Sequence, residues 1–104
     1  MIIKNVPHKI LFLFLFLFSF NLEASDLSWQ SAKAGNKIIL IRHSLAPGGG
    51  DPKGFNINDC KTQRNLNTTG IEQSKNIGKL FKENKIPIDQ VLSSQRCRCK
   101  DTAK

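Results

Sequence analysis

The sequence predicts an α/β fold, in which two short apolar strands flank one helix. The first strand lies in the stretch KIILIRHS at residues 37–44, where residues 38–41 are apolar without polar alternation. That pattern is typical of a strand buried on both faces. The second strand is expected at residues 90–93, with Val91 and Leu92 buried. A strand–helix–strand crossover is almost always right-handed and parallel, so the carboxyl ends of both strands should meet at one edge. Open α/β sheets bind ligands at that edge.

The helix between the strands is predicted from local signals. Asn67 is a good N-cap, with Thr68 as the alternative. From residue 71 onward, apolar side chains recur on one face of the predicted helix: Ile71, Ile77, Leu80 and Phe81. Asn84 and Pro87 end the helix. A second helix is expected to begin at Cys97, directly after the second strand.

The first 24 residues predict a secretory signal peptide. Lys4 and Lys9 precede an unbroken apolar run at residues 10–20, and small Ala24 offers a cleavage position. The run is shorter than the roughly 20 residues that a membrane-spanning helix needs. An uncleaved anchor and a buried core element are the alternatives. We expect residues 25–104 to form the mature domain, in the periplasm or outside the cell.

The charge balance favours an anionic partner. The 104-residue chain has 16 basic and 8 acidic residues, a net charge of +8. No basic helix interleaved with aromatic residues and no helix-turn-helix pattern occurs in the sequence, so nucleic acid is not expected. The expected partner is a phosphorylated small molecule or phosphoprotein, and membrane contact is expected only during export. No metal or other cofactor is expected, because the cysteine spacing matches no common zinc site.

The three cysteines, Cys60, Cys97 and Cys99, would lie in an oxidising compartment after export. Cys97 and Cys99 are too close in sequence to pair easily with each other. We therefore predict a disulfide from Cys60 to either Cys97 or Cys99, with one thiol left over.

Four side chains are candidates for a phosphate site. Arg42 and His43 end the first strand, and alone they would be an ordinary polar strand end. Arg64 precedes the first helix, and Arg98 lies in the first turn of the second, where a cation opposes the helix dipole and so favours a role in anion binding. Arginine forks orient phosphate, helped by free N–H groups at a helix start. Neutral His43 could then attack phosphorus and form a phosphohistidine that water hydrolyses.

Three segments resemble the histidine phosphatase (phosphoglycerate mutase-like) superfamily. IRHS at 41–44 is similar to its strand-end Arg-His-Gly motif, and RNLNTTGIEQSKNIGKLF at 64–81 to its Arg-x-Leu-(Ser/Thr)-x-x-Gly helix start. VLSSQRCRCKDTA at 91–103 is similar to its Ser-Ser-x-x-x-Arg-x-x-x-Thr-Ala segment. The resemblance covers residues 37–104, with the motifs in the family's order and spacing.

This resemblance implies a three-layer α/β sheet domain and phosphomonoester hydrolysis through a phosphohistidine. It implies that His43 is the catalytic nucleophile and that Arg42 and Arg98 bind the phosphate. Arg64 matches a position that joins the phosphate pocket in some compact members, whereas Arg96 falls on a variable position and is expected at the surface.

The sequence departs from the family pattern in two ways. Ser44 stands where the motif usually has glycine, so its side chain would either crowd the pocket or donate to phosphate. The family's second pocket histidine and acidic proton donor lie further along the chain, and no motif assigns Asp51 or Asp59 as that acid. We therefore expect the chain to be a truncated N-terminal half of such a domain, inactive alone.

Two alternatives remain open at this point. One is a non-catalytic phosphate- or anion-binding relic of the same family. The other is a small secreted cationic protein that acts on membranes or nucleic acid, which three ordered motifs argue against.

Overall fold

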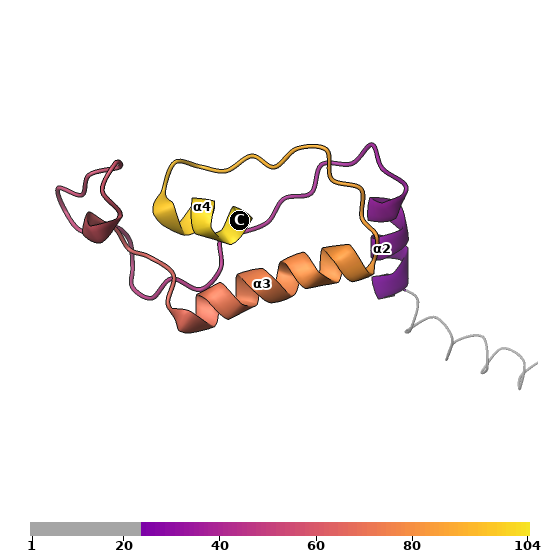
Figure 1. The fold of residues 1–104 in the computed structure, drawn as a ribbon, viewed down its shortest axis with the longest axis horizontal. Helices are drawn as coiled ribbons and strands as arrows, with labels where there is room; N and C mark the ends of the chain where they lie inside the picture. The colour runs from indigo at the N-terminus through magenta and orange to yellow at the C-terminus, as the bar shows by residue number, and fades with distance from the viewer. Residues whose placement is uncertain (1–23) are drawn as a thin grey trace, which may run out of the picture. The chain divides into compact units, whose positions relative to one another are not determined.

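The computed structural model describes residues 24–104, with side chains from residue 26 onward, so the predicted signal peptide falls almost wholly outside the described residues. The described residues contain three α-helices and one short 3₁₀ turn (Figure 1). These elements are α2 (Ala24–Lys33), η1 (Cys60–Thr62), α3 (Thr68–Glu83) and α4 (Cys97–Ala103). The chain divides into two compact units, residues 1–37 and residues 38–104.

Helix α2 belongs to the first unit. Asp26 lies in its first turn and Lys33 in its last, which places both charges favourably in the helix dipole. Gly35 follows with φ +78°, a left-handed conformation that commonly ends a helix. In the described part of the chain, no helix combines the length and the apolar character needed to cross a bilayer.

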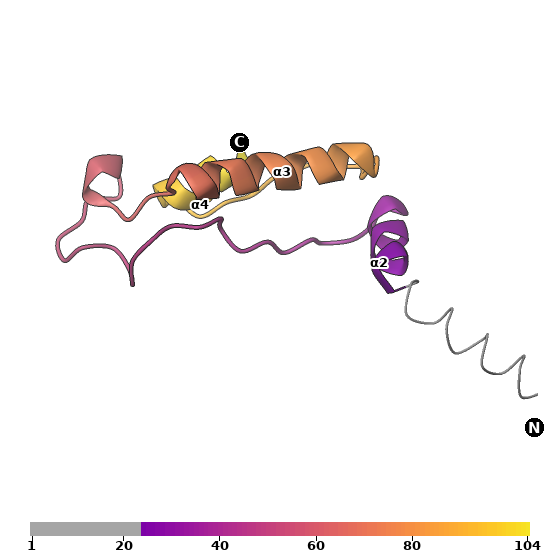
Figure 2. The same ribbon diagram turned by 90° about the horizontal axis from the view of Figure 1, so that it is seen from below.

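The prediction of a parallel α/β unit was wrong, because residues 24–104 contain no strand and no sheet. Residues 38–42 and 90–94 run as extended chain (Figures 1 and 2). No backbone hydrogen bond joins these two segments of the second unit. Ile38 and Leu40 are 90% and 91% exposed. The expected three-layer sheet is therefore not seen.

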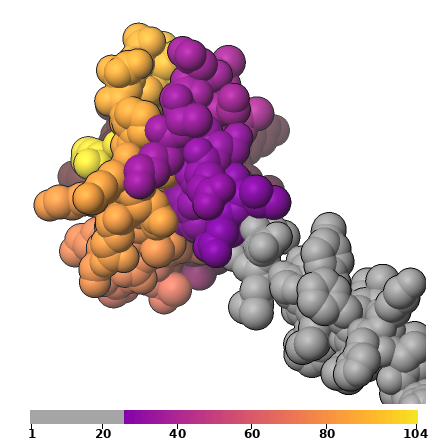
Figure 3. Space-filling model, turned by 90° about the vertical axis from the view of Figure 1, so that its right-hand side faces the viewer, coloured from indigo at the N-terminus to yellow at the C-terminus, as the bar shows by residue number. Residues whose placement is uncertain are grey.

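The physical reason is that a strand requires a neighbour. Its N–H and C=O groups become a ladder only when a second strand receives them. An apolar, β-branched run is favoured in a strand with a buried face. The run itself cannot provide the second strand that it must pair with. Leu92, predicted to be buried in the second strand, is 82% exposed. The surrounding chain, orange to amber in the space-filling view of Figure 3, lies at the surface.

Helix α3 forms where the local signals predicted it. The side chain of Asn67 accepts a hydrogen bond from Gly70 N at 2.8 Å, which confirms the N-cap. At the other end, the backbone N–H of Asn84 caps the helix on the carbonyl oxygens of Leu80 and Lys82. Lys85 then takes a left-handed φ of +52°.

The apolar face of α3 is less covered than the pattern predicts. Ile71 and Leu80 are both exposed, at 45% and 46%. The buried apolar residues of the described chain are few, namely Ala46, Ile86 and Cys97. Polar contacts and one disulfide therefore carry much of the packing of the second unit.

Helix α4 lies alongside the N-terminal half of α3 (Figures 1 and 2). Chain segment 44–46 contacts both helices. At Gly70 an added Cβ would lie 2.1 Å from the carbonyl oxygen of Leu45, so only glycine permits this close approach. The contact brings the residues after His43 against the start of α3.

Candidate active site

His43 is half-buried, and its two ring nitrogens have different partners. Nδ1 lies 2.8 Å from the carbonyl oxygen of Ser44, and Nε2 lies 3.3 Å from Nη2 of Arg64. A carbonyl can only accept, and a guanidinium can only donate. These partners therefore assign the proton to Nδ1 and leave the lone pair of the neutral ring on Nε2.

Hydrogen bonds from α3 and α4 hold the chain directly after His43. Ser44 N donates to Thr102 Oγ1 at 3.0 Å, and the hydroxyl groups of Ser44 and Ser74 share a hydrogen bond of 2.7 Å. Leu45 N donates to Gln73 Oε1 at 2.9 Å. The backbone N–H groups of Ser44 and Leu45 thus donate to side chains, and not to the carbonyl oxygens of a neighbouring strand. The imidazole consequently lies on a segment held from two sides.

Ser44 occupies the position where the family motif usually has glycine. It is 3% exposed, and its hydroxyl is turned to Ser74 of α3. Ser44 Oγ accepts from Ser74 Oγ, so the Ser44 side chain fastens the segment to α3.

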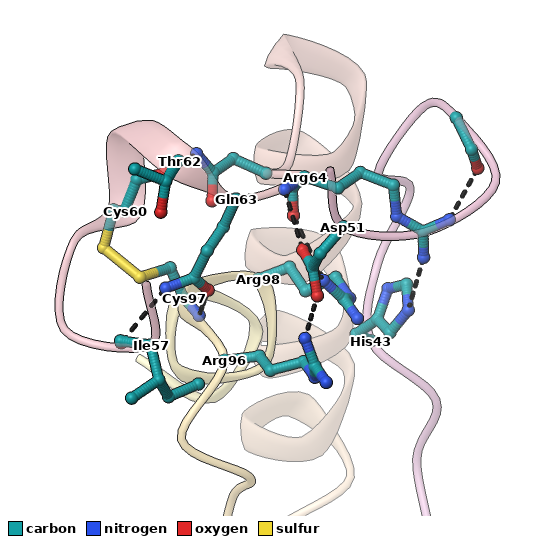
Figure 4. A network of polar contacts seen from close by, with 12 residues as sticks. His43, Asp51, Ile57, Cys60, Thr62, Gln63, Arg64, Arg96, Cys97 and Arg98 are labelled. Carbon is teal, nitrogen blue, oxygen red and sulfur yellow. Dashed lines mark hydrogen bonds and ion pairs between the residues drawn. A yellow bond between two sulfur atoms is a disulfide. The ribbon is translucent and has the colours of Figure 1, made fainter. Parts of the chain in front are cut away.

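Arg64 is brought to His43 by contacts along its whole length (Figure 4). Its backbone N donates to Asp51 Oδ1 at 2.9 Å, and its Nη1 donates to the carbonyl oxygen of Gly48. Gly48 has φ +104°, a left-handed conformation that aims this carbonyl at the arginine without a side chain between them. The remaining terminal nitrogen, Nη2, is the group that reaches His43.

Asp51 lies at the centre of the arginine cluster (Figure 4). Its side chain is 4% exposed and forms ion pairs with Arg96 and with Arg98, the latter at 2.8 Å. Arg98 Nη1 also donates to the carbonyl oxygen of Arg64 at 3.3 Å. Arg96 in turn packs over the ring of Phe55, with its guanidinium carbon 4.6 Å from the ring centroid.

A disulfide between Cys60 and Cys97 ties the start of α4 to the segment that leads into Arg64. Of the two partners that the sequence left open for Cys60, the structure has Cys97, and Cys99 is a free thiol. Buried Gln63 reinforces this link, because its Oε1 accepts from Cys97 N at 3.0 Å. Its amide nitrogen donates to the carbonyl oxygens of Asn56 and Ile57, both at 3.0 Å.

The first N–H of α4 has a partner within the described residues, because Cys97 N donates to Gln63 Oε1. The N–H groups of Cys99 and Lys100 donate to the carbonyl oxygen of Arg96. Of the N–H groups that the sequence predicted to face an anion, the one of Cys97 is therefore not free.

The structure brings three of the four predicted site residues into one network: His43, Arg64 and Arg98. Arg42, the fourth, is exposed and has no described hydrogen bond or ion pair in residues 24–104. Arg96, expected at the surface, instead joins the cluster through Asp51. Within the described residues, no group of three or more metal-binding side chains is found.

Sequence reasoning missed the roles of Asp51 and Gln63. Both lie in polar stretches with a loop-like composition, and neither belongs to one of the three family-like motifs. One available signal was composition: acidic residues are scarce in this chain, and Asp51 directly follows the glycine run beside the first candidate residues. Its pairing with arginines 45 and 47 positions away was not predictable from local pattern.

Two donors in this cluster are sealed from solvent and have no partner among the described residues, Arg64 Nε and Arg98 Nε. Buried polar groups are nearly always hydrogen-bonded.

Comparison with protein families supplies an independent finding. The family model of the histidine phosphatase superfamily (branch 1) matches residues 38–104, which is more than half of the chain. Comparison with curated proteins and with solved structures gave no match. The matched range contains His43, Arg64 and Arg98 and coincides with the second compact unit. The chain belongs to the histidine phosphatase superfamily.

Proposed function

We propose that this chain carries the nucleophile of a phosphohydrolase: Nε2 of His43 takes the phosphoryl group of a phosphomonoester and then passes it to water. Without an assigned proton donor, we expect the chain alone to turn over ordinary phosphomonoesters negligibly. The observation that carries the proposal is the pair of contacts on the imidazole. Nδ1 faces a carbonyl oxygen, and Nε2 faces a guanidinium that would also contact an incoming phosphate. Membership in a phosphatase superfamily supports the same reaction class.

In the first step, Arg64 Nη2 moves from the lone pair of His43 Nε2 to the phosphoryl oxygens. That lone pair then attacks phosphorus, and the P–O bond to the leaving group breaks. The leaving oxygen takes the electron pair and requires a proton. In the second step, water attacks the phosphohistidine and gives up a proton to solvent. The P–N bond breaks, its electron pair returns to Nε2, and inorganic phosphate leaves. Ser44 O keeps the Nδ1 proton in place through both steps, so that Nε2 regains its lone pair.

Arg64 and Arg98 would balance the charge of the transferred group. Phosphoryl transfer is catalysed mainly by positioning and by electrostatic stabilisation of the phosphoryl oxygens. Arg64 is already within hydrogen-bonding distance of Nε2, and its own carbonyl contacts Arg98. Arg42, next to His43 in sequence, is proposed as a further phosphate ligand that approaches from the exposed side.

Asp51 is not proposed as the proton donor. Its oxygens accept from Arg64 N, Arg96 and Arg98, and none of these donors can accept a proton in return. Because no donor is assigned to the leaving group, the first test uses phosphodonors whose leaving group needs little protonation.

The test is direct detection of phosphohistidine. The purified chain is incubated with p-nitrophenyl phosphate or phosphoramidate, and intact mass and peptide mapping locate any added phosphoryl group. We expect an acid-labile, alkali-stable phosphoryl group on His43, none in His43→Gln, and much slower reaction with alkyl phosphates.

Phosphate binding without any phosphohistidine would overturn the catalytic proposal and leave an anion-binding protein in its place. Phosphorylation that persists unchanged in His43→Gln would overturn the assignment of the nucleophile. Turnover of alkyl phosphates as fast as aryl phosphates would show that the chain has a proton donor after all.

We also propose that the protein is exported and cleaved near Ala24. The charged start and the apolar run at residues 10–20 support export. A disulfide between Cys60 and Cys97 is compatible with an oxidising compartment. N-terminal sequencing of the protein from the periplasm or medium tests this, and an intact Met1 in a membrane fraction would contradict it.

A further inference from the structure

We propose that Asp51 is a positioning residue, which orients Arg98 and Arg96 so that their remaining donors face the phosphoryl group on its way to His43. The inference rests on the proposed function of His43 and deepens it. Asp51 is negatively charged, and so is the phosphate that the proposed site would bind. The two would repel each other, so the presence of Asp51 in this site needs an explanation. A carboxylate among phosphate-binding arginines either competes with the ligand or holds the arginines for it.

The contacts of Asp51 favour the holding role. Oδ1 accepts from Arg64 N at 2.9 Å and from Arg98 Nη1 at 2.8 Å, while Oδ2 accepts from Arg96 Nη1. The carboxylate is thus engaged from three sides, and its side chain is 4% exposed. A ligand in solvent cannot take the place of this carboxylate without breaking all three contacts.

The engaged nitrogens leave part of each guanidinium free. Arg98 uses Nη1 for Asp51 and for the carbonyl oxygen of Arg64, and only its Nε is sealed without a partner. Nη2 of Arg98 has no described partner and is not among these sealed atoms. Because a guanidinium is a rigid planar fork, fixing Nη1 also fixes the direction of Nη2.

Arg96 is held in the same manner from two directions. Its Nη1 pairs with Asp51, and its guanidinium lies over the ring of Phe55. Its side chain is nevertheless 37% exposed, so part of it remains open to a ligand. Asp51 therefore links two arginines and the backbone of a third, Arg64, whose side chain touches His43.

Asp51→Asn tests this role, because asparagine has nearly the same shape but removes the charge and turns an NH₂ donor toward a guanidinium. We expect the rate of phosphoryl transfer to His43 to fall about 10- to 100-fold, as for a misplacement of about 1 Å. The dissociation constant for inorganic phosphate should change less than about threefold, because two effects oppose each other. The less well oriented arginines weaken binding, and the loss of the negative charge of Asp51 strengthens it. Transfer is followed by quenched-flow mass spectrometry, and phosphate binding by calorimetry.

Asp59→Asn is the matched control. It makes the same chemical change in the same loop region, but Asp59 caps η1 by accepting from Lys61 N and contacts no arginine. Asparagine can keep that cap. We expect both the transfer rate and the phosphate affinity of this variant to match those of the unmutated protein.

The results separate the possible roles. A parent-like transfer rate in Asp51→Asn would overturn the proposal. Tighter phosphate binding by tenfold or more, with undiminished transfer, would make Asp51 a competitor. A parallel loss of rate, affinity and folded fraction would make its role structural only. If the unmutated protein itself forms no phosphohistidine, the proposed function has failed.

Arginine side-chain ¹⁵N spectra of the unmutated protein then decide the role of Asp51 independently, and they also decide it if Asp51→Asn does not fold. The Arg98 signals, assigned by their loss in Arg98→Lys, should show slow rotation of the guanidinium without phosphate, and this should persist at saturating phosphate. Free rotation of the guanidinium without phosphate, or release of Nη1 when phosphate binds, would overturn the proposal.

Discussion

Arg64 and His43 lie 21 positions apart in the chain, and Nη2 of the arginine lies 3.3 Å from Nε2 of the histidine. The arginine reaches this position because Asp51 and Gly48 hold its backbone and its other terminal nitrogen. This donor occupies the lone pair of Nε2 in the structure, and we expect it to move to the phosphoryl oxygens when a phosphate enters. This relationship makes Arg64 the first target for testing the site.

Replacing Arg64 by glutamine should slow phosphorylation of His43 by about 10²- to 10³-fold, the usual cost of removing one preorganised donor to a developing charge. The measurement is single-turnover formation of phosphohistidine from p-nitrophenyl phosphate. Lys53→Gln, which removes a charge from an exposed loop position, should leave the rate unchanged. Equal rates in Arg64→Gln and Lys53→Gln would exclude Arg64 from the phosphate site.

Variants of Arg98 and Arg42 should differ in their effects on the free energy of unfolding and on phosphate binding. Arg98→Gln removes one of two ion pairs of Asp51 and should lower the free energy of unfolding by about 1.5–3 kcal/mol, because Asp51 keeps Arg96 and Arg64 N as partners. Arg42→Gln changes an exposed side chain and should alter stability by less than about 0.5 kcal/mol. If Arg42 binds phosphate, its replacement still weakens phosphate binding. Urea unfolding and calorimetric titration measure the two effects, and a stability loss in Arg42→Gln as large as in Arg98→Gln would contradict this reading.

Breaking the Cys60–Cys97 disulfide should lower the free energy of unfolding by about 3–4 kcal/mol in the chain-entropy model, given a sequence separation of 37 residues. Cys60→Ser tests this in urea unfolding under oxidising conditions. Cys99→Ser is the control, because Cys99 is the free thiol. Destabilisation by Cys99→Ser as large as that by Cys60→Ser would mean that Cys99, and not Cys97, is the partner in solution.

Two glycines of α3 give opposite predictions for the same substitution. Gly70→Ala would place a Cβ 2.1 Å from the carbonyl oxygen of Leu45, and the forced shift should cost about 1–3 kcal/mol of stability. Gly78→Ala meets no atom within 4 Å and should stabilise the helix by about 0.5–1 kcal/mol. Chemical denaturation of both variants checks the pair, and equal effects would show that segment 44–46 does not pack on Gly70.

The sequence by itself determined the features that depend on neighbouring residues. Asn67 accepts from Gly70 N three positions away, so the start of α3 follows from a short motif. The segments with Arg-His, Arg-x-Leu and Ser-Ser also identified the family, because each motif is contiguous, and the family match covers residues 38–104. His43 and Arg64 could be named as candidates for the same reason.

Only the tertiary structure decided what those candidates contact. Residues 38–41 have the apolar pattern of a buried strand, yet Ile38 is 90% exposed, because a strand depends on a partner that its own residues cannot specify. Asp51 had no motif, and its role follows from three donors that distant parts of the chain bring to one carboxylate. Local pattern encodes caps and helical faces, whereas the pairing of buried charges and strands depends on which distant segments meet in the folded chain.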